Sequence, residues 1–388
     1  MFVNLRRIHK IQIARLLTTG LILSVVMLHW EELDEHVVSH VRSYSYRLMV
    51  NNYNFLNSSF TYSADGHQRS LGNSLNPLPL HPYLISQSDK CSNSNKILLL
   101  LFVKSPPQNV DRRHNIRQTW GKEGSIRETL NSSVKVMFVL GVHPNLQQQQ
   151  NTQNLVENES RIYEDIIQQN FLDTFHNLTT KLIMQFHWAT NYCSKAKFVM
   201  SADDDIFVHM PNMVRYLRGK NKKQVSNFWV GHVHRGAPPI RRKESKYHVP
   251  VELYPWPSYP DYTAGAGYVV SGDVATKIHQ VTQILNSSMY IDDVYMGMCA
   301  QVIGVTPQDY AYFSGEGTTR YHPCVYAQML TSHGHADDVR TLWKEATDPK
   351  VDKMTKGVLS KLYCTAVKVV LLCLPHLRDT YGCSAAFL

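Results

Sequence analysis

The run Ile97-Leu-Leu-Leu-Leu-Phe-Val103 decides the fold class. A strand that is apolar at every position is buried on both of its faces. Similar runs recur at residues 134–140, 196–200 and 228–230, and residues 155–189 follow helical spacing between them, as two helices. Strands that alternate with helical segments predict an α/β domain with a mostly parallel central sheet flanked by helices. We expect this domain to occupy residues 96–388.

Residues 11–30 form an apolar segment of a different kind. Twenty mostly apolar residues would span roughly 30 Å as a helix, about the hydrocarbon thickness of a bilayer. Arg6, Arg7 and Lys10 precede the segment and acidic residues follow it, which predicts a cytoplasmic tail over residues 1–10 and a lumenal body. A cleaved signal peptide is the alternative, because the uninterrupted apolar core is short. No small-residue cleavage site follows, so we favour an uncleaved signal anchor and a single-pass type II membrane protein.

Residues 31–95 are rich in Asn, Ser, Tyr and Pro and predict a loosely ordered lumenal stem. Seven widely spaced cysteines in an oxidising lumen predict disulfides with one thiol left over. Five glycosylation sequons also agree with a lumenal body, since all of them follow the apolar segment. They are Asn57, Asn131, Asn158, Asn177 and Asn286.

The net charge of +9 does not indicate a nucleic-acid partner. Four of the positive charges stand in the first thirty residues with no acid among them, and the rest of the excess is spread along the chain. A groove-binding protein needs its basic residues concentrated on one face. We therefore expect no nucleic acid.

Three consecutive acids, Asp203-Asp204-Asp205, follow the run at residues 196–200. Adjacent carboxylates at a strand end repel one another unless a cation neutralises them. Carboxylates suit Mg²⁺ and Mn²⁺, which can bridge the phosphates of a nucleotide, and doubly wound sheets bind ligands at the carboxyl ends of their strands. A solvated acidic turn is the alternative, which the flanking apolar residues disfavour. His322 or His333 could complete the metal site.

Three further blocks carry possible chemistry, and each has an ordinary structural alternative. Arg113 and Arg117 share a helix face and could bind phosphate or ribose, or form surface ion pairs. Asp292-Asp293 could supply a general base or simply open a helix. Residues 256–271 combine small residues with aromatic ones that suit sugar rings, but a loop entering a strand has the same composition.

Taken together, the blocks resemble the Golgi β1,3-glycosyltransferase family, which contains β1,3-galactosyl- and β1,3-N-acetylglucosaminyltransferases. The matching blocks stand in the family's order and spacing. They are Arg113-x-x-x-Arg117-x-Thr-Trp120, Asp203-Asp-Asp-Ile-Phe207, Tyr259-Pro-Asp-Tyr-Thr-Ala-Gly-Ala-Gly-Tyr268 and Asp292-Asp-Val-Tyr-x-Gly297. The resemblance implies a Rossmann-like GT-A fold and an inverting, metal-dependent transfer from a UDP-sugar.

The resemblance also implies a role for each matching residue. Asp205 and His333 would hold Mn²⁺ or Mg²⁺, and Asp293 would be the catalytic base. The remaining residues would contact the donor: Asp203 and Asp204 near uridine, ribose and metal, Arg113, Arg117 and Trp120 lining the nucleotide pocket, and Tyr262, Gly265 and Gly267 between donor and acceptor.

Further motifs, such as His234-Arg-Gly-Ala-Pro-Pro-Ile-Arg241 and Tyr321-His-Pro-Cys324, are similar to family members that use UDP-GlcNAc as donor and lactosylceramide, or a related galactose-terminated acceptor, at the Golgi membrane. UDP-galactose as donor, or a glycoprotein N-acetyllactosamine chain as acceptor, would use the same chemistry. A non-catalytic carbohydrate-binding protein or a metal-dependent phosphodiesterase belongs to other classes, and the intact acidic blocks disfavour the first. The sequence gives no oligomeric state.

Overall fold

The computed structural model describes residues 12, 15–23, 41, 44–45, 80–92, 96–285, 288–315, 317–318, 322–355, 357–373 and 381–387. The anchor expected over residues 11–30 and the stem expected over residues 31–95 lie largely outside these ranges, as do Asn57 and Asn286. Among the described residues, none of the helices has both the length and the apolar character needed to cross a membrane.

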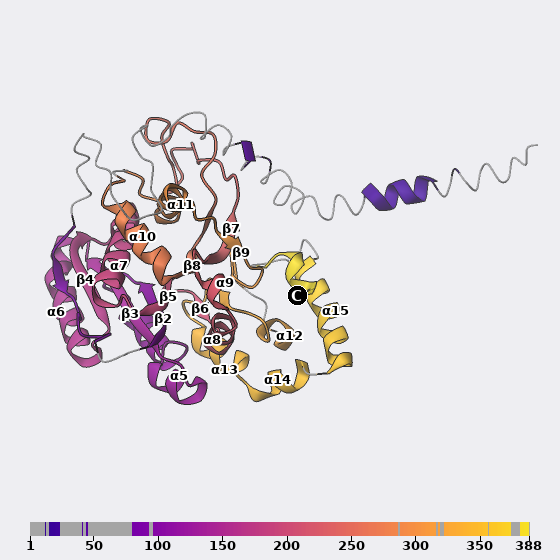
Figure 1. The fold of residues 1–388 in the computed structure, drawn as a ribbon, viewed down its shortest axis with the longest axis horizontal. Helices are drawn as coiled ribbons and strands as arrows, with labels where there is room; N and C mark the ends of the chain where they lie inside the picture. Colours follow the sequence, from indigo (N-terminus) through magenta and orange to yellow (C-terminus); the bar gives the residue numbers. More distant parts are fainter. Residues whose placement is uncertain are drawn as a thin grey trace, which may run out of the picture.

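One sheet of eight strands forms the centre of the fold (Figure 1). Its strands β2, β3, β4 and β5 are mutually parallel. The strand β8 runs antiparallel to its neighbours β5 and β7, and β1 runs antiparallel to β4 at the edge of the sheet. This arrangement confirms the expected mostly parallel sheet. In spatial order the strands are β1 (Tyr83–Ile85), β4 (Ile166–Leu172), β3 (Val134–Val142), β2 (Ile97–Lys104), β5 (Ala196–Asp203), β8 (Tyr262–Ser271), β7 (Trp229–His234) and β9 (Gln308–Asp309).

The position of β2 in the middle of the sheet explains its apolar composition. Leu99, Leu101 and Val103 pack into one hydrophobic cluster, while Leu100 and Phe102 pack into a second cluster on the opposite face of the sheet. Successive side chains of a strand point to opposite faces, so a strand covered on both sides must be apolar throughout.

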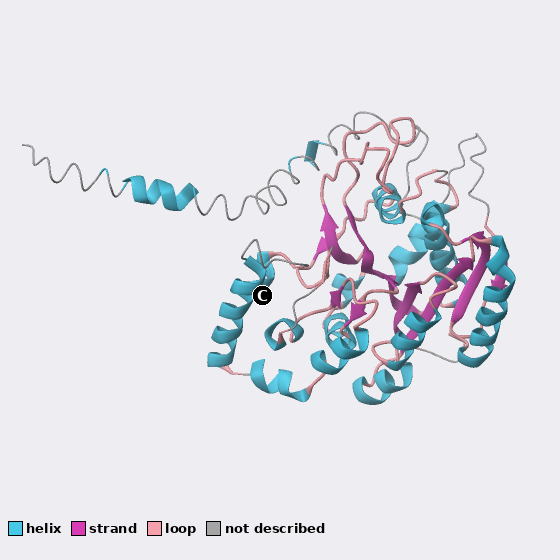
Figure 2. Cartoon of the chain, turned by 180° about the vertical axis from the view of Figure 1, so that it is seen from behind, coloured by secondary structure: helices cyan, strands magenta, loops and turns pink. Residues whose placement is uncertain are grey.

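Helices cover both faces of the sheet (Figure 2). One cluster receives side chains from α4 (Val110–Gln118), α5 (Glu123–Leu130), α6 (Leu146–Tyr163), α8 (Met210–Arg218) and α13 (Val339–Ala346). The other receives them from α7 (Leu178–Tyr192), α10 (Gly272–Thr282) and α11 (Asp292–Val302). The remaining elements are η2 (Phe175–Asn177), β6 (Phe207–Val208), α9 (Lys222–Val225), α12 (Pro323–Tyr326), β10 (Thr331–Ser332), α14 (Pro349–Thr355), α15 (Val358–Cys373) and η3 (Cys383–Phe387).

The expectation of two helices over residues 155–189 was wrong in one respect, because strand β4 separates α6 from α7. The strand carries Gln168 and Gln169, which are both buried. The Gln168 amide donates to the carbonyl oxygen of Gly141 at 2.9 Å, and its oxygen accepts from Gln153 at 2.9 Å. Because neighbouring elements satisfy these polar groups, the strand loses the apolar pattern by which it could be recognised.

Three disulfides join Cys91 to Cys193, Cys324 to Cys364, and Cys373 to Cys383, and the thiol of Cys299 is free and buried. The predicted disulfides and the single leftover thiol are therefore confirmed. The second bridge ties α12 to α15 and holds the C-terminal helix against the domain.

Candidate active site

The acidic run lies at the carboxyl end of β5, as expected. Strand β6 follows it at once and pairs with β10, so that Ser332 stands opposite Phe207. This pairing places His333, the next residue, beside Asp205. The carboxylates of Asp203 and Asp205 and the imidazole of His333 offer three ligand atoms within 4.8 Å of one another.

These three residues fit a divalent cation. The Oδ1 atom of Asp205 is buried and has no hydrogen-bond partner within the described part of the chain. The Nε2 atom of His333 lies 3.5 Å from it, beyond normal hydrogen-bond length. A buried carboxylate oxygen without a donor is costly, and a cation removes that cost. Two carboxylates and an imidazole are suitable ligands for Mn²⁺ or Mg²⁺.

Asp204 points to different partners. Its oxygens accept hydrogen bonds from Ser105 Oγ at 2.7 Å, Asn109 Nδ2 at 2.8 Å and Arg112 Nη1 at 2.9 Å. Asp204 therefore fixes the acidic turn to the loop between β2 and α4, and it lies outside the metal-competent cluster. Sequence reasoning passed over these three donors, although all of them stand in the segment that follows the first strand.

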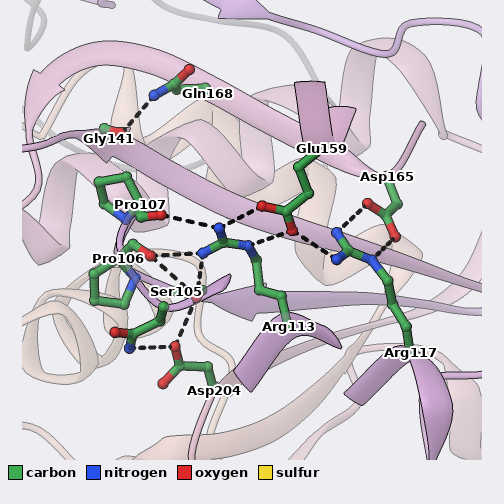
Figure 3. Close-up of polar contacts among 11 residues, drawn as sticks. Ser105, Pro106, Pro107, Arg113, Arg117, Gly141, Glu159, Asp165, Gln168 and Asp204 are labelled. Atoms are coloured by element: carbon green, nitrogen blue, oxygen red, sulfur yellow. Dashed lines mark hydrogen bonds and ion pairs between the residues drawn. The ribbon is translucent and has the colours of Figure 1, made fainter. Parts of the chain in front are cut away.

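The arginines of α4 do share a face, but that face points into the protein (Figure 3). Arg113 is completely buried and donates to Glu159 at 2.8 and 2.6 Å and to the carbonyl oxygens of Pro106 and Pro107. Arg117 donates to Glu159 at 2.7 Å and to both oxygens of Asp165 at 2.8 Å.

Burial alone would raise the pKa of Glu159, but the hydrogen bonds and charges of Arg113 and Arg117 outweigh it and lower that pKa. Trp120 is also completely buried. None of these side chains lines the cavity described below, so the structure corrects the expectation that Arg113, Arg117 and Trp120 line a nucleotide pocket. The hydrogen bonds of Arg113 and Arg117 to Glu159 hold α4 against α6, and Arg117 also ties α4 to Asp165, just before β4.

The acidic pair Asp292-Asp293 opens α11, and Lys104 joins it to the acidic run at the end of β5. The Nζ atom of Lys104, at the end of β2, lies 3.0 Å from Asp203 Oδ1 and 2.9 Å from Asp292 Oδ2. It also donates to the carbonyl oxygen of Gly265 at 3.0 Å. Sequence reasoning missed Lys104, although a lysine that ends an otherwise apolar buried strand is itself a signal.

Asp293 has the properties of a general base. Burial, reinforced by the charge of Asp292 and opposed by that of Lys104, raises the pKa of Asp293 to about 7. The backbone N–H of Val294 donates to its Oδ1 at 2.8 Å. A Cβ atom at Gly265 would lie 3.5 Å from Asp293 Oδ2, so the glycine-rich strand β8 passes directly beside the carboxylate. A carboxylate with a pKa near neutrality is well placed to exchange protons.

A cavity of about 620 Å³ brings the two acidic groups together. Its size is that of a site for a small-molecule ligand. Its wall includes Asp203, Asp204, Asp205 and His333, then Lys104, Asp292 and Asp293, and also Tyr262 and Gly265. Gly267 is not part of the wall; a Cβ atom there would lie 2.8 Å from Ile206 Cδ1, so this glycine permits close packing beneath the cavity.

His234 lies on the same wall, with its ring 5.0 Å from that of Tyr262. Burial, with a smaller contribution from the neighbouring His232, lowers the pKa of His234 to about 4. Its imidazole is therefore neutral at physiological pH and can pair with an uncharged polar group.

Three of the expected glycosylation sites fall among the described residues. Asn131 and Asn158 are exposed. Asn177 is half-buried, and its Nδ2 donates to the carbonyl oxygen of Leu172 at 2.8 Å. Whether they carry glycans stays a prediction.

Residues 111–311 match the galactosyltransferase family. The chain is 54% identical to lactosylceramide 1,3-N-acetyl-beta-D-glucosaminyltransferase A of Danio rerio and 51% identical to lactosylceramide 1,3-N-acetyl-beta-D-glucosaminyltransferase of Homo sapiens, in each case over 100% of both chains. A solved glycosyltransferase involved in glycosylation of the major capsid of PBCV-1 matches 61% of this chain and 92% of its own at 12% identity and a TM-score of 0.34, too distant to bear on the argument.

The protein belongs to the galactosyltransferase family. It is a glycosyltransferase, and the family resemblance of its motifs is confirmed.

Proposed function

We propose that the protein transfers GlcNAc from UDP-GlcNAc in β1,3 linkage to the terminal galactose of lactosylceramide. The names of its full-length relatives support this donor and acceptor. The observation that carries the chemistry is the single cavity that Asp293 shares with Asp203, Asp205 and His333.

In this proposal Asp203, Asp205 and His333 would hold a divalent cation, Mn²⁺ or Mg²⁺, which would neutralise charge on the donor diphosphate. Asp204 keeps the acidic turn in place through its three hydrogen bonds. Tyr262 and Gly265 lie on the wall of the same cavity, and the proposal assigns them to the region between donor and acceptor.

Asp293 accepts the proton of the galactose 3-hydroxyl while that oxygen attacks the anomeric carbon of GlcNAc. The new C–O bond forms on the face opposite the departing UDP, so the bond to the diphosphate breaks with inversion and no covalent enzyme intermediate is needed. General-base assistance of this kind contributes about 10²–10⁴-fold. A carboxylate whose pKa is about 7 is ionised in about half of the molecules at pH 7 and in most of them at a slightly higher pH.

Lys104 acts as a positioning residue. By binding Asp203 and Asp292 at once it fixes the distance between the metal cluster and the start of α11, and so between the donor and the base.

We further propose that residues 1–10 are cytoplasmic, that residues 11–30 anchor the protein in the Golgi membrane, and that residues 31–95 form a stem. The charge asymmetry around the apolar segment supports this orientation. The three disulfides support a lumenal catalytic domain.

The direct test is to incubate the full chain with Mn²⁺, UDP-GlcNAc and lactosylceramide and to assign the product linkage by NMR. We expect GlcNAcβ1,3Gal, and no product after chelation of the metal. Transfer only from UDP-galactose, or only to a glycoprotein glycan, would overturn the proposed specificity and leave the mechanism standing. An α-linked product would refute the inverting mechanism.

A further inference from the structure

The wall of the cavity changes from charged to apolar on one side of Asp293. Phe175 and Leu178 reach this part from η2 and the start of α7, and Pro238, Ile240 and Tyr247 reach it from the segment between β7 and β8. The aromatic rings pack on one another, since the centroid of Phe175 lies 5.2 Å from that of Tyr247. We call Phe175, Leu178, Ile240 and Tyr247 the apolar end of the cavity.

The contacts place the apolar end close to Asp293. Lys104 connects Asp203 of the metal cluster to Asp292, the neighbour of Asp293. Tyr290 stands three residues before Asp293, and its ring lies 6.3 Å from that of Phe175. The base therefore has both the metal cluster and the apolar end near it on the wall of one cavity.

The apolar end is exposed although the segment that carries it is well anchored. Ile240 and Tyr247 are 38% and 39% exposed. Between them, Arg241 donates to the carbonyl oxygens of Val249 at 2.7 Å and Tyr254 at 2.6 Å. Hydrogen bonds thus hold the backbone in place while neighbouring apolar side chains remain open to the cavity.

Lys246 also fixes the orientation of the rings. Its Nζ lies 4.8 Å from the ring centroid of Tyr247 and 5.6 Å from that of Phe175, within the range of a cation–π contact. Exposed apolar groups arranged in this way beside polar ones are typical of a ligand surface.

The geometry of in-line displacement indicates that the acceptor is the substrate near this surface. The attacking oxygen approaches the anomeric carbon from the side opposite the diphosphate, so the acceptor lies beyond Asp293 as seen from the metal cluster. An acceptor whose 3-hydroxyl contacts Asp293 can extend its remaining atoms along the apolar end, which lies near that carboxylate.

We propose that the apolar end binds the aglycone side of the acceptor: the second sugar against the rings of Phe175 and Tyr247, and the first methylenes of the lipid against Ile240 and Leu178. The inference rests on the proposed function and deepens it, because it assigns the recognition of a glycolipid to named residues.

The test compares two acceptors that share a sugar and differ only in the aglycone: lactose, and hexyl β-lactoside kept below its micelle concentration. The full chain is assayed in a non-ionic detergent with Mn²⁺ and UDP-GlcNAc. Each buried methylene is worth about fourfold in affinity, so partial burial of the hexyl chain should raise kcat/KM at least about 10-fold over lactose. Ile240→Ser and Tyr247→Ala should each reduce this preference about 5-fold or more. The KM for UDP-GlcNAc should stay unchanged.

Leu362→Ser is the matched control, because Leu362 is an exposed apolar residue of α15 that does not line the cavity; it should keep the full preference. Wild-type enzyme that uses lactose and hexyl lactoside equally, or a preference that survives both cavity variants, overturns this inference and leaves the proposed function intact. Wild-type enzyme that transfers GlcNAc to neither acceptor, nor to lactosylceramide, overturns both.

Discussion

Replacing Lys104 with methionine removes a buried positive charge while keeping the length and most of the volume of the side chain. Two carboxylates lose their cation in this variant. Asp292, with 7% of its side chain exposed, has little access to water, whereas Asp203, at 36%, can recover hydration. Breaking a buried ion pair by removing one partner costs about 3–5 kcal/mol. Most of that cost should fall on Asp292.

The loss has an upper limit, because a carboxyl without its cation can bind a proton instead. Protonating an ordinary aspartate at pH 7 costs about 4 kcal/mol, at about 1.4 kcal/mol for each pH unit above a pKa of about 3.9. We therefore expect Lys104→Met to lower the free energy of unfolding by about 3–4 kcal/mol at pH 7, and by progressively less as the pH falls toward 5.

Denaturant unfolding with the disulfides intact, repeated between pH 5 and pH 8, measures this deficit. Lys135→Met is the matched control, since Lys135 lies on the neighbouring strand β3 with its Nζ 3.7 Å from Glu123 near the surface, where an ion pair contributes at most about 1 kcal/mol. A deficit below about 1 kcal/mol for Lys104→Met, or one that does not vary with pH, would refute this reasoning. The charge of Lys104 also opposes the rise in the pKa of Asp293, so the acid limb of kcat/KM should move above pH 7 in whatever fraction folds.

Three other substitutions separate the roles assigned above. Asp293→Asn should lower kcat about 10²–10⁴-fold with UDP-GlcNAc binding retained. Because the pKa of Asp293 is raised to about 7 in the native state, its carboxyl ionises in the unfolded state but stays protonated in the native state between about pH 4 and pH 7. This difference weakens stability as the pH rises over that range, and the variant should lack that slope in unfolding measurements. Asp205→Asn should weaken Mn²⁺ binding at least about 10-fold by titration calorimetry, whereas Asp337→Asn, a change at an exposed nearby acid, should not. Arg113→Ala should cost about 3–5 kcal/mol of stability yet leave the KM for UDP-GlcNAc near wild type; a large rise in that KM, absent from the exposed control Arg127→Ala, would return Arg113 to the nucleotide site.

The sequence was sufficient for features that a local pattern determines. Seven consecutive apolar residues are enough to predict that β2 is buried on both of its faces. The three acids at the end of β5 predict a bound cation, because carboxylates so close together repel one another. The residues alone offered both His322 and His333, and the family resemblance selected His333, since its approach to Asp205 depends on the pairing of β6 with β10.

The features that sequence reasoning missed depend on contacts between distant segments. Lys104 and Asp292 are 188 residues apart, and only the fold brings them to 2.9 Å. For the arginines of α4, helical spacing correctly predicts a shared face, but it does not tell which side that face turns to. The face points inward because its arginines pair with Glu159 of α6 and with Asp165, which precedes β4.

Charge balance in the cavity joins these observations. Six carboxylates lie on its wall: Asp173, Asp203, Asp204, Asp205, Asp292 and Asp293. Lys181 pairs with Asp173, Arg112 pairs with Asp204, and Lys104 is shared between Asp203 and Asp292. Lys246 also lines the cavity, so four positive charges face six acids. Holding Asp293 partly protonated, with its pKa near 7, relieves one negative charge but withholds the base. A diphosphate brought into the same cavity would add further repulsion of several kcal/mol at these distances. A divalent cation at Asp203, Asp205 and His333 would relieve both problems, since it would offset the charge of the donor and allow Asp293 to ionise.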